Sequence, residues 1–251
     1  MKNNLEYKEL IIGFIDYTSL NPMDNQNTIK SKCQELINIK NIKDYSNNFV
    51  ASFCTFSEYG NIVSKELKNT NIKTAVVAGY FPLGQAHLEL KIKEVEYACN
   101  NADEIDYVFS IGKFLNNEYD FIDNELNVIR NICKDRTLKI IIETGELKTE
   151  DNIIKACKLC IKNNVDFIKT STGKTPISAT IEAVQTIALE IKKHYLKTNK
   201  PIGIKVSGGI TNISQAIEFV KIVENTLGEK WISPQLFRIG TSRLNQILNI
   251  I

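Results

Sequence analysis

Short runs of apolar residues alternate along the chain with longer segments in which apolar residues recur every three or four positions. The short runs have the length and composition of β-strands, and the longer segments have the period of amphipathic helices. Eight strands are predicted, over Leu10 to Tyr17, Phe49 to Cys54, Ile72 to Tyr80, Glu104 to Phe109, Leu138 to Thr144, Val165 to Ser171, Ile202 to Val206 and Leu236 to Ile239. Helices are predicted between them, over Ile29 to Ile37, Leu88 to Ala98, Leu126 to Cys133, Ile181 to Ile191 and Ile213 to Val223. This alternation in 251 residues favours a (β/α)8 TIM barrel over an open sheet, and no linker divides residues 1–251 into separate domains.

Several predicted strands carry polar residues at every second position. Lys205 and Ser207 share one face of the seventh strand, and Glu104 and Asp106 share one face of the fourth. The same parity groups Lys169 with Ser171, Lys139 with Glu143, and Asp16 with Thr18. Parallel strands that are buried on both faces are normally apolar throughout. If the aliphatic parity faces the helices, the polar parity points into the barrel, and the interior is a functional site.

Two lysines stand out because each lies inside a run that otherwise reads as a buried strand. They are Lys169 in Phe167-Ile168-Lys169-Thr170-Ser171-Thr172 and Lys205 in Ile204-Lys205-Val206. A buried ammonium group is costly unless it is paired or neutralised. A lysine attacks a carbonyl only as the free amine, which requires its pKa to fall from about 10.4 to about 7 or 8, or roughly 4 kcal/mol. A second ammonium about 5 Å away supplies on the order of 3 kcal/mol, and partial burial can supply the rest.

Proton transfer and phosphate binding have candidates on the neighbouring strands. Asp106 is the best-placed carboxylate for moving protons, and Asp16 is a second. Glycine-rich turns with hydroxyl groups follow the seventh and eighth strands, where barrels often bind a phosphate through backbone N–H groups and the start of a short helix. The candidates are Ser207, Gly208 and Gly209, then Gly240, Thr241 and Ser242 before a predicted helix from Arg243 to Ile250, with Gly173 and Lys174 after the sixth strand.

Structural explanations compete with each of these interpretations. A strand lysine can extend its ammonium to solvent, Lys205 can simply pair with a carboxylate, and Asp106 can be a structural hydrogen-bond acceptor. Lys139 and Glu143 can form an interior ion pair, and Ser207-Gly208-Gly209 can be a plain turn.

Composition and charge narrow the class of protein. The net charge of +2 gives no electrostatic case for binding nucleic acid or a membrane surface. The first residues do not resemble a signal peptide and no run approaches 18 apolar residues, so a soluble, cytoplasmic protein is expected. The six cysteines are expected to be reduced, with Cys157 and Cys160 as small core residues of an amphipathic helix. The two histidines, His87 and His194, are far apart, so no metal site is expected.

Several of these motifs together resemble the deoxyribose-phosphate aldolases, which are class I (Schiff-base) aldolases with a TIM-barrel fold. The resemblance runs nearly from end to end of the chain. It rests on Asp16-Tyr17-Thr18, Ala102 to Asp106, Ile140 to Leu147, Asp166 to Gly173, and Lys205 to Ile210. The stretches Lys-Thr-Ser-Thr-Gly and Ile-Glu-Thr-Gly-Glu-Leu are long and specific.

The resemblance implies a role for each candidate residue. Lys169 matches the Schiff-base lysine, Lys205 the lysine that perturbs it, and Asp106 the proton-handling aspartate. Gly173, Lys174, Gly208, Gly209, Gly240, Thr241 and Ser242 match the substrate-phosphate site, and Asp16 and Ser207 are expected at the same substrate site. The implied reaction is the reversible cleavage of 2-deoxy-D-ribose 5-phosphate to acetaldehyde and D-glyceraldehyde 3-phosphate in nucleoside catabolism, with no metal or organic cofactor. The partners are then a phosphorylated sugar and aldehydes, and barrels of this kind often pair, which allows a homodimer.

Two departures from the family pattern affect the predicted site. Thr211 follows the Gly-Gly-Ile turn where an arginine is often found, and Tyr80 precedes Phe81-Pro82 where an asparagine is common. Two other functions therefore stay open. One is a Schiff-base barrel aldolase with a different donor or phosphorylated sugar. The other is a non-catalytic barrel, although a binding protein gains nothing from two buried ammonium groups.

Overall fold

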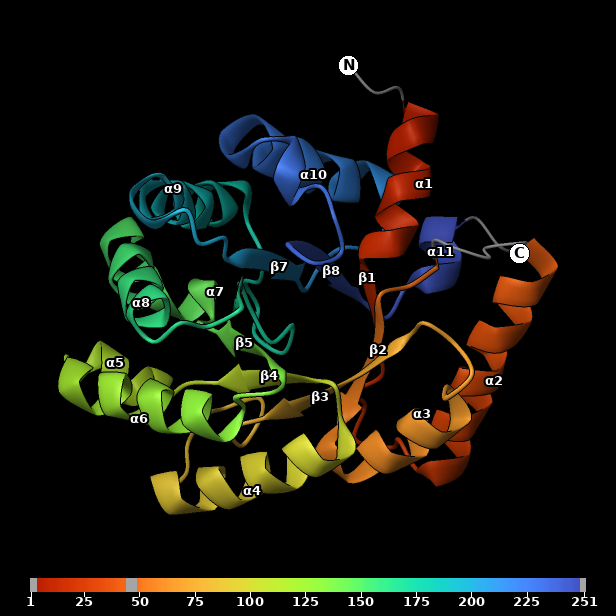
Figure 1. Ribbon diagram of the computed structural model, residues 1–251, viewed down its shortest axis with the longest axis horizontal. Coiled ribbons are helices and arrows are strands. Elements are labelled where there is room, and N and C mark those ends of the chain that lie inside the picture. Colours follow the sequence, from red (N-terminus) through yellow and green to blue (C-terminus); the bar gives the residue numbers. More distant parts are fainter. Residues whose placement is uncertain (1–3, 44–48, 249–251) are drawn as a thin grey trace.

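Eight parallel strands form a closed barrel with helices around it (Figure 1). The computed structural model describes residues 4–43 and 49–248, so the ends of the predicted domain and of the last predicted helix lie outside the described residues. The strands are β1 (Ile15–Thr18), β2 (Ser52–Phe56), β3 (Lys73–Ala78), β4 (Glu104–Val108), β5 (Thr137–Ile141), β6 (Phe167–Lys169), β7 (Gly203–Ser207) and β8 (Phe237–Thr241). Each strand pairs with the next in the chain, and β8 closes the ring on β1. The predicted TIM-barrel fold class is confirmed.

The helices lie outside the strands and cover them. The longer ones are α1 (Asn4–Phe14), α2 (Gln26–Lys43), α4 (Leu88–Asn101), α6 (Tyr119–Ile132), α8 (Glu150–Lys162), α9 (Ile181–Thr198) and α10 (Ile213–Leu227). Shorter ones are α3 (Gly60–Glu66), α5 (Ile111–Leu115), α7 (Thr144–Leu147), α11 (Leu244–Leu248) and the 3-10 turns η1 (Ser57–Tyr59) and η2 (Glu229–Trp231). Helices α8, α9 and α10 begin where Thr149, Thr180 and Asn212 accept a hydrogen bond from an amide three residues later. Such N-caps stabilise a helix by about 1 kcal/mol each.

The prediction of a first strand from Leu10 was wrong over most of its length. The helix α1 continues through Phe14, and only Ile15–Thr18 is a strand. Tyr7, Ile11 and Phe14 recur at helical spacing and are buried. Figure 1 places α1 beside α10, where the hydroxyl of Tyr7 donates to Glu224 at 2.6 Å. The apolar stretch before Ile15 is therefore one face of a helix that packs against its neighbour.

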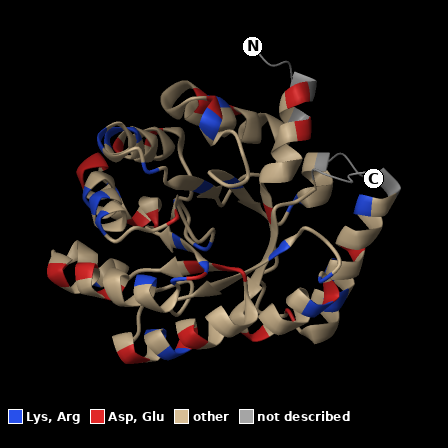
Figure 2. Cartoon of the chain, viewed as in Figure 1, with Lys and Arg blue, Asp and Glu red and all other residues tan. Residues whose placement is uncertain are grey.

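Apolar side chains fill the layer between strands and helices, and this layer is the main core. Cys157 and Cys160 belong to it, as the helical spacing predicts. The barrel interior is different, because lysine, arginine and acidic residues lie on the strands within the ring (Figure 2). None of the helices in the described part of the chain combines the length and the apolar content needed to cross a membrane.

Candidate active site

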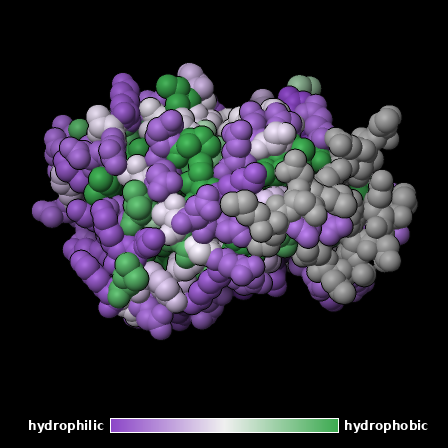
Figure 3. Space-filling model, turned by 90° about the horizontal axis from the view of Figure 1, so that it is seen from above, coloured by the Kyte–Doolittle hydropathy of each residue, from purple (hydrophilic) through white to green (hydrophobic). Residues whose placement is uncertain are grey.

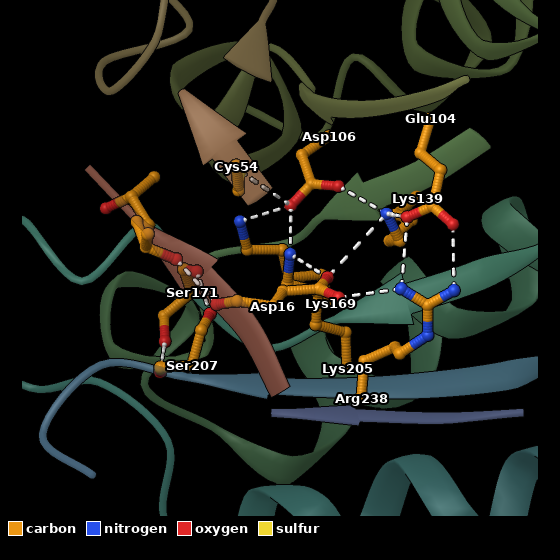
Figure 4. A network of polar contacts seen from close by, with 12 residues as sticks. Asp16, Cys54, Glu104, Asp106, Lys139, Lys169, Ser171, Lys205, Ser207 and Arg238 are labelled. Atoms are coloured by element: carbon orange, nitrogen blue, oxygen red, sulfur yellow. Dashed lines mark hydrogen bonds and ion pairs between the residues drawn. The ribbon is translucent and has the colours of Figure 1, made fainter. Parts of the chain in front are cut away.

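A network of charged side chains fills the barrel interior (Figure 4). It contains three carboxylates, Asp16 of β1 and Glu104 and Asp106 of β4, and four cations, Lys139 of β5, Lys169 of β6, Lys205 of β7 and Arg238 of β8. Lys169, Lys205 and Arg238 are register partners across the last three strands, so their side chains project on the same side of the sheet. The sequence parity that predicted polar residues in the interior is thus found in the structure.

The carboxylate of Asp106 lies at the centre of this network. Its Oδ2 accepts hydrogen bonds from Lys169 Nζ at 2.7 Å and from Lys205 Nζ at 2.6 Å. Its Oδ1 accepts from Lys139 Nζ at 2.9 Å. The thiol of Cys54 lies 3.9 Å from Oδ2. The Asp106 carboxylate is therefore shared by three ammonium groups.

A second set of ion pairs lies at Glu104 and Arg238. Arg238 donates to Asp16 Oδ1 at 2.6 Å and to both oxygens of Glu104, at 2.8 and 3.1 Å. Lys139 donates to Glu104 at 2.5 Å and so links this set to Asp106. Lys205 Nζ lies 2.5 Å from Asp16 Oδ2, a charge contact only, since this oxygen has no hydrogen-bond partner among the described residues.

The network divides the three lysines into two kinds. Burial lowers the pKa of Lys169, and although the Asp106 carboxylate opposes this, the charge of Lys205 adds to it, so the pKa of Lys169 lies below its ordinary value. Burial disfavours charged Lys139 and Lys205 as well, but each faces several carboxylates and its pKa is raised. Burial would raise the pKa of Asp106, but its three lysines hold the pKa well below the ordinary value. Among these three lysines, Lys169 is therefore the one whose pKa lies below the ordinary value.

The direction of this shift agrees with the sequence expectation, but its main cause differs. A repelling second ammonium was expected to supply most of the shift, with burial as the remainder. Burial is the largest cause, because Lys169 is only 3% exposed, and the effect of the Lys205 charge ranks below the opposing effect of the Asp106 carboxylate.

A cavity of about 260 Å³ opens at the carboxyl ends of the strands, and Lys169 lines it. The other predicted residues in its wall are Gly173, Lys174, Ser207, Gly208, Gly209, Gly240, Thr241 and Ser242. Gly208 has φ 84°, and an added Cβ would lie 2.3 Å from Ser178 Oγ, so a side chain does not fit there. Ser171 and Ser207 tie two of the loops together, because Ser171 Oγ donates to the Ser207 carbonyl at 2.5 Å.

Asp16 is not where it was expected. It is fully buried in the ion network, and it does not line the cavity. Asp106 and Lys205 are also absent from the cavity wall and are connected to it through Lys169. Of the two departures, Thr211 lines the cavity and Tyr80 does not.

The alternative of an interior Lys139–Glu143 ion pair was wrong. Lys139 pairs with Glu104 and Asp106. Glu143, in the left-handed conformation at φ 51°, accepts hydrogen bonds from the Thr172 amide at 3.2 Å and from the Thr175 hydroxyl at 3.2 Å. Glu143 therefore holds the loop that follows β6.

Two arginines were missed by sequence reasoning. Arg238 lies inside a predicted strand at a position whose parity could have been examined as it was for the lysines. Arg243 lines the cavity, but only the path of the loop after β8 brings it there. Among the described residues, no group of three or more His, Cys, Asp or Glu side chains is arranged to hold a metal ion.

A closed parallel eight-stranded barrel with a glycine-lined cavity at the carboxyl ends of its strands has the architecture of a TIM-barrel enzyme. The chain belongs to the DeoC/LacD family of aldolases, whose family model matches residues 16–231. The protein is therefore an enzyme of the aldolase class, a carbon–carbon lyase.

Known relatives support this assignment along nearly the whole chain. The chain is 33% identical over 244 residues to the deoxyribose-phosphate aldolase of Homo sapiens, covering 93% of this chain and 76% of the relative. It is 33% identical over 233 residues to the deoxyribose-phosphate aldolase of Metamycoplasma hominis, covering 92% and 97%. A solved aldolase structure superposes with a TM-score of 0.76 at 29% identity, covering 95% of this chain and 94% of that one.

Proposed function

We propose that the enzyme cleaves 2-deoxy-D-ribose 5-phosphate reversibly to acetaldehyde and D-glyceraldehyde 3-phosphate, with Lys169 as the Schiff-base nucleophile. The observation that carries this proposal is the position of Lys169. It is the lysine of the network whose pKa is lowered, and it is also the one that lines the cavity. The substrate assignment is supported by relatives named deoxyribose-phosphate aldolase.

The reaction begins when the free amine of Lys169 adds to the aldehyde carbon of the open-chain sugar. Loss of water from the carbinolamine gives an iminium ion at C1, which can accept the electron pair of the C2–C3 bond as the C1–C2 enamine forms. Removal of the proton from the C3 hydroxyl group breaks the C2–C3 bond, releases D-glyceraldehyde 3-phosphate and leaves the enamine of acetaldehyde on Lys169. Protonation of this enamine and hydrolysis of the iminium ion release acetaldehyde and restore the amine.

Asp106 and Lys205 are the proton-handling groups of this proposal. Asp106 lies 2.7 Å from Lys169 Nζ, which is within reach for direct proton transfer to and from the carbinolamine. Lys205 donates to the same oxygen at 2.6 Å, so the proton on Lys205 and the negative charge on Asp106 stay beside the reacting nitrogen. Asp16 contributes by keeping Lys205 protonated.

The phosphate group is assigned to the end of the cavity formed by the loops after β6, β7 and β8. Backbone N–H groups of glycine-rich turns bind phosphate oxygens well, because no side chain obstructs their approach. Two cations also line the cavity, Arg243 and Lys174, and Lys174 donates to the Leu20 carbonyl at 2.6 Å. Arg243 thus supplies a guanidinium in a site where Thr211 is neutral.

The proposal is tested by borohydride reduction in the presence of acetaldehyde, followed by intact-mass and peptide analysis. An ethyl adduct is expected on Lys169, and none is expected in the Lys169→Leu variant. The Lys162→Leu variant is a matched control, because Lys162 is an exposed lysine of α8 whose loss should leave trapping unchanged. No adduct in a folded protein would refute the Schiff-base mechanism. An adduct on Lys205 would reverse the two lysine roles.

The donor and acceptor are tested separately. D-Glyceraldehyde 3-phosphate with acetaldehyde is expected to be the best pair in a panel that includes ketone donors and non-phosphorylated acceptors. Preference for a ketone donor, with Lys169 still trapped, would keep the mechanism and replace the substrate.

A further inference from the structure

The charged network in the barrel interior holds four cations and three carboxylates. Two of its residues, Arg238 and Glu104, lie outside the wall of the substrate cavity and still contribute to this charge balance. They line a different cavity of about 540 Å³, which also contacts Asp166 and Phe167 at the start of β6 and therefore lies at the amino-terminal end of the barrel. Their side chains are almost completely buried, at 7% and 4% exposure. No step of the proposed reaction requires either residue to touch the substrate.

Both residues are connected to Lys169 through shared carboxylates and lysines. Arg238 binds Asp16 and Glu104, two of the three carboxylates, so the negative charge of these two is shared between the arginine and the lysines. Glu104 binds Lys139, which also binds Asp106, and Asp106 is the carboxylate that contacts Lys169. Removing Arg238 would leave three lysines facing three carboxylates. Removing the charge of Glu104 would leave four cations facing two carboxylates.

We propose that Arg238 and Glu104 are positioning residues that set, with opposite sign, the pH at which Lys169 becomes a free amine. This inference rests on the proposed role of Lys169. The positive charge of Arg238 favours deprotonation of Lys169, and the negative charge of Glu104 opposes it. Lys169 is the lysine that responds, because it contacts a single carboxylate while Lys139 and Lys205 each contact two or more.

The groups that face Lys169 within the described residues have distinct titration ranges. They are Cys54 of β2, Asp106 of β4, Glu143 after β5 and Lys205 of β7. Burial raises the pKa of Cys54 to about 11. Neighbouring charges hold the pKa of Asp106 below the neutral range and the pKa of Lys205 above it. Burial raises the pKa of Glu143, so Glu143 is the one neighbour that needs a control.

The test follows the acid limb of kcat/KM against pH, together with the pH dependence of borohydride trapping with acetaldehyde. The acid limb of kcat/KM reports the ionisation of the free enzyme. Glu104→Gln is expected to move the limb to lower pH and Arg238→Gln to higher pH, each by about one pH unit for a unit charge at barrel-interior distances. The double variant is expected to return close to the wild-type limb. In the Glu143→Gln background, Glu104→Gln should still move the acid limb to lower pH.

A purely structural role would reduce the plateau rate without moving the limb in opposite directions. Limbs that stay fixed, or that move the same way in both single variants, would overturn the inference. If Arg238→Gln does not fold, the near-isosteric Glu104→Gln variant tests the inference alone, because its acid limb must move to lower pH. Wild-type enzyme that traps no acetaldehyde on Lys169 would instead refute the proposed function, so the two failures are distinguishable.

Chemical rescue gives a second readout. Arg238→Ala would enlarge the cavity at the amino-terminal end of the barrel, which already borders Arg238 and Glu104. Guanidinium chloride at non-denaturing concentration is expected to bind there and shift the acid limb back towards wild type. Urea at the same concentration has a similar shape and no charge, and it should have no effect. Equal effects of the two would show that filling the space, and not the positive charge, restores the enzyme.

Discussion

Asp106→Asn is the most informative single change for testing the ion network, because it removes charge and nearly preserves shape. Asp106 is fully buried and contacts Lys139, Lys169 and Lys205 at 2.9, 2.7 and 2.6 Å. Removing one partner of a buried ion pair typically costs about 3–5 kcal/mol, because the remaining charge is left without compensation. We expect a loss of this size in the free energy of unfolding at pH 7.

The pH dependence of this loss has a definite sign. The pKa of Asp106 is depressed in the folded protein, while the unfolded value is about 3.9. Its stabilising contribution is therefore fully present above about pH 5 and is lost as the pH falls below about 4 through the folded-state value. The difference in stability between wild type and Asp106→Asn should accordingly shrink between about pH 5 and pH 2.

Urea denaturation followed by circular dichroism at several pH values measures this difference. Asp120→Asn is the matched control, since Asp120 is exposed in the first turn of α6 and its substitution should change stability by less than about 0.5 kcal/mol. A loss below about 1 kcal/mol for Asp106→Asn at pH 7 would refute the reasoning. So would a loss that stays constant down to pH 2.

Three further outcomes are expected. Arg243→Gln should raise KM for D-glyceraldehyde 3-phosphate about tenfold, as expected for one charged hydrogen bond, and should leave KM for D-glyceraldehyde unchanged; equal effects on both acceptors would remove Arg243 from the phosphate site. Gly208→Ala should weaken phosphate binding more than Gly209→Ala in the same assay, because only Gly208 has Ser178 Oγ where its Cβ would lie; the reverse order would contradict this geometry. Ile11→Ala should reduce the free energy of unfolding by about 2–5 kcal/mol, since Ile11 is fully buried in α1; a thermal or urea midpoint like that of wild type would show that α1 does not contribute to the core.

The sequence predicted the barrel and most of its interior because two independent patterns agreed: the alternation of strands and helices along the chain, and the alternation of apolar and polar residues within strands. Strand-like runs alternated with helical segments, and within β6 and β7 the lysines stood out, since Lys169 follows Phe167-Ile168 and Lys205 lies between Ile204 and Val206. The helix α1 was missed because its apolar residues run directly into those of β1, so no change of period marks residue 15 as a boundary. The place of Asp16 was also missed, because parity assigns a residue to the interior but does not give its depth within the barrel.

Contacts that depend on several loops or strands had no signal in the sequence. The sharing of Asp106 among three lysines requires the relative heights of four strands, and the approach of Arg243 to the cavity requires the path of the loop after β8. Arg238 is a different case. Its charge lay in a predicted strand between Phe237 and Ile239, so the parity test that found the lysines would have placed it in the interior.

The closure of the barrel has a consequence for the order in which the chain can acquire its site. Asp16 lies on the first strand and Arg238 on the last, and β1 and β8 are paired in the finished ring. During synthesis, Asp16 therefore cannot bind Arg238 until residues 237–241 have left the ribosome. Before that point its carboxylate remains hydrated, and amino-terminal fragments lacking β8 cannot contain the complete network. The complete network can therefore form only after the final strand has paired with the first.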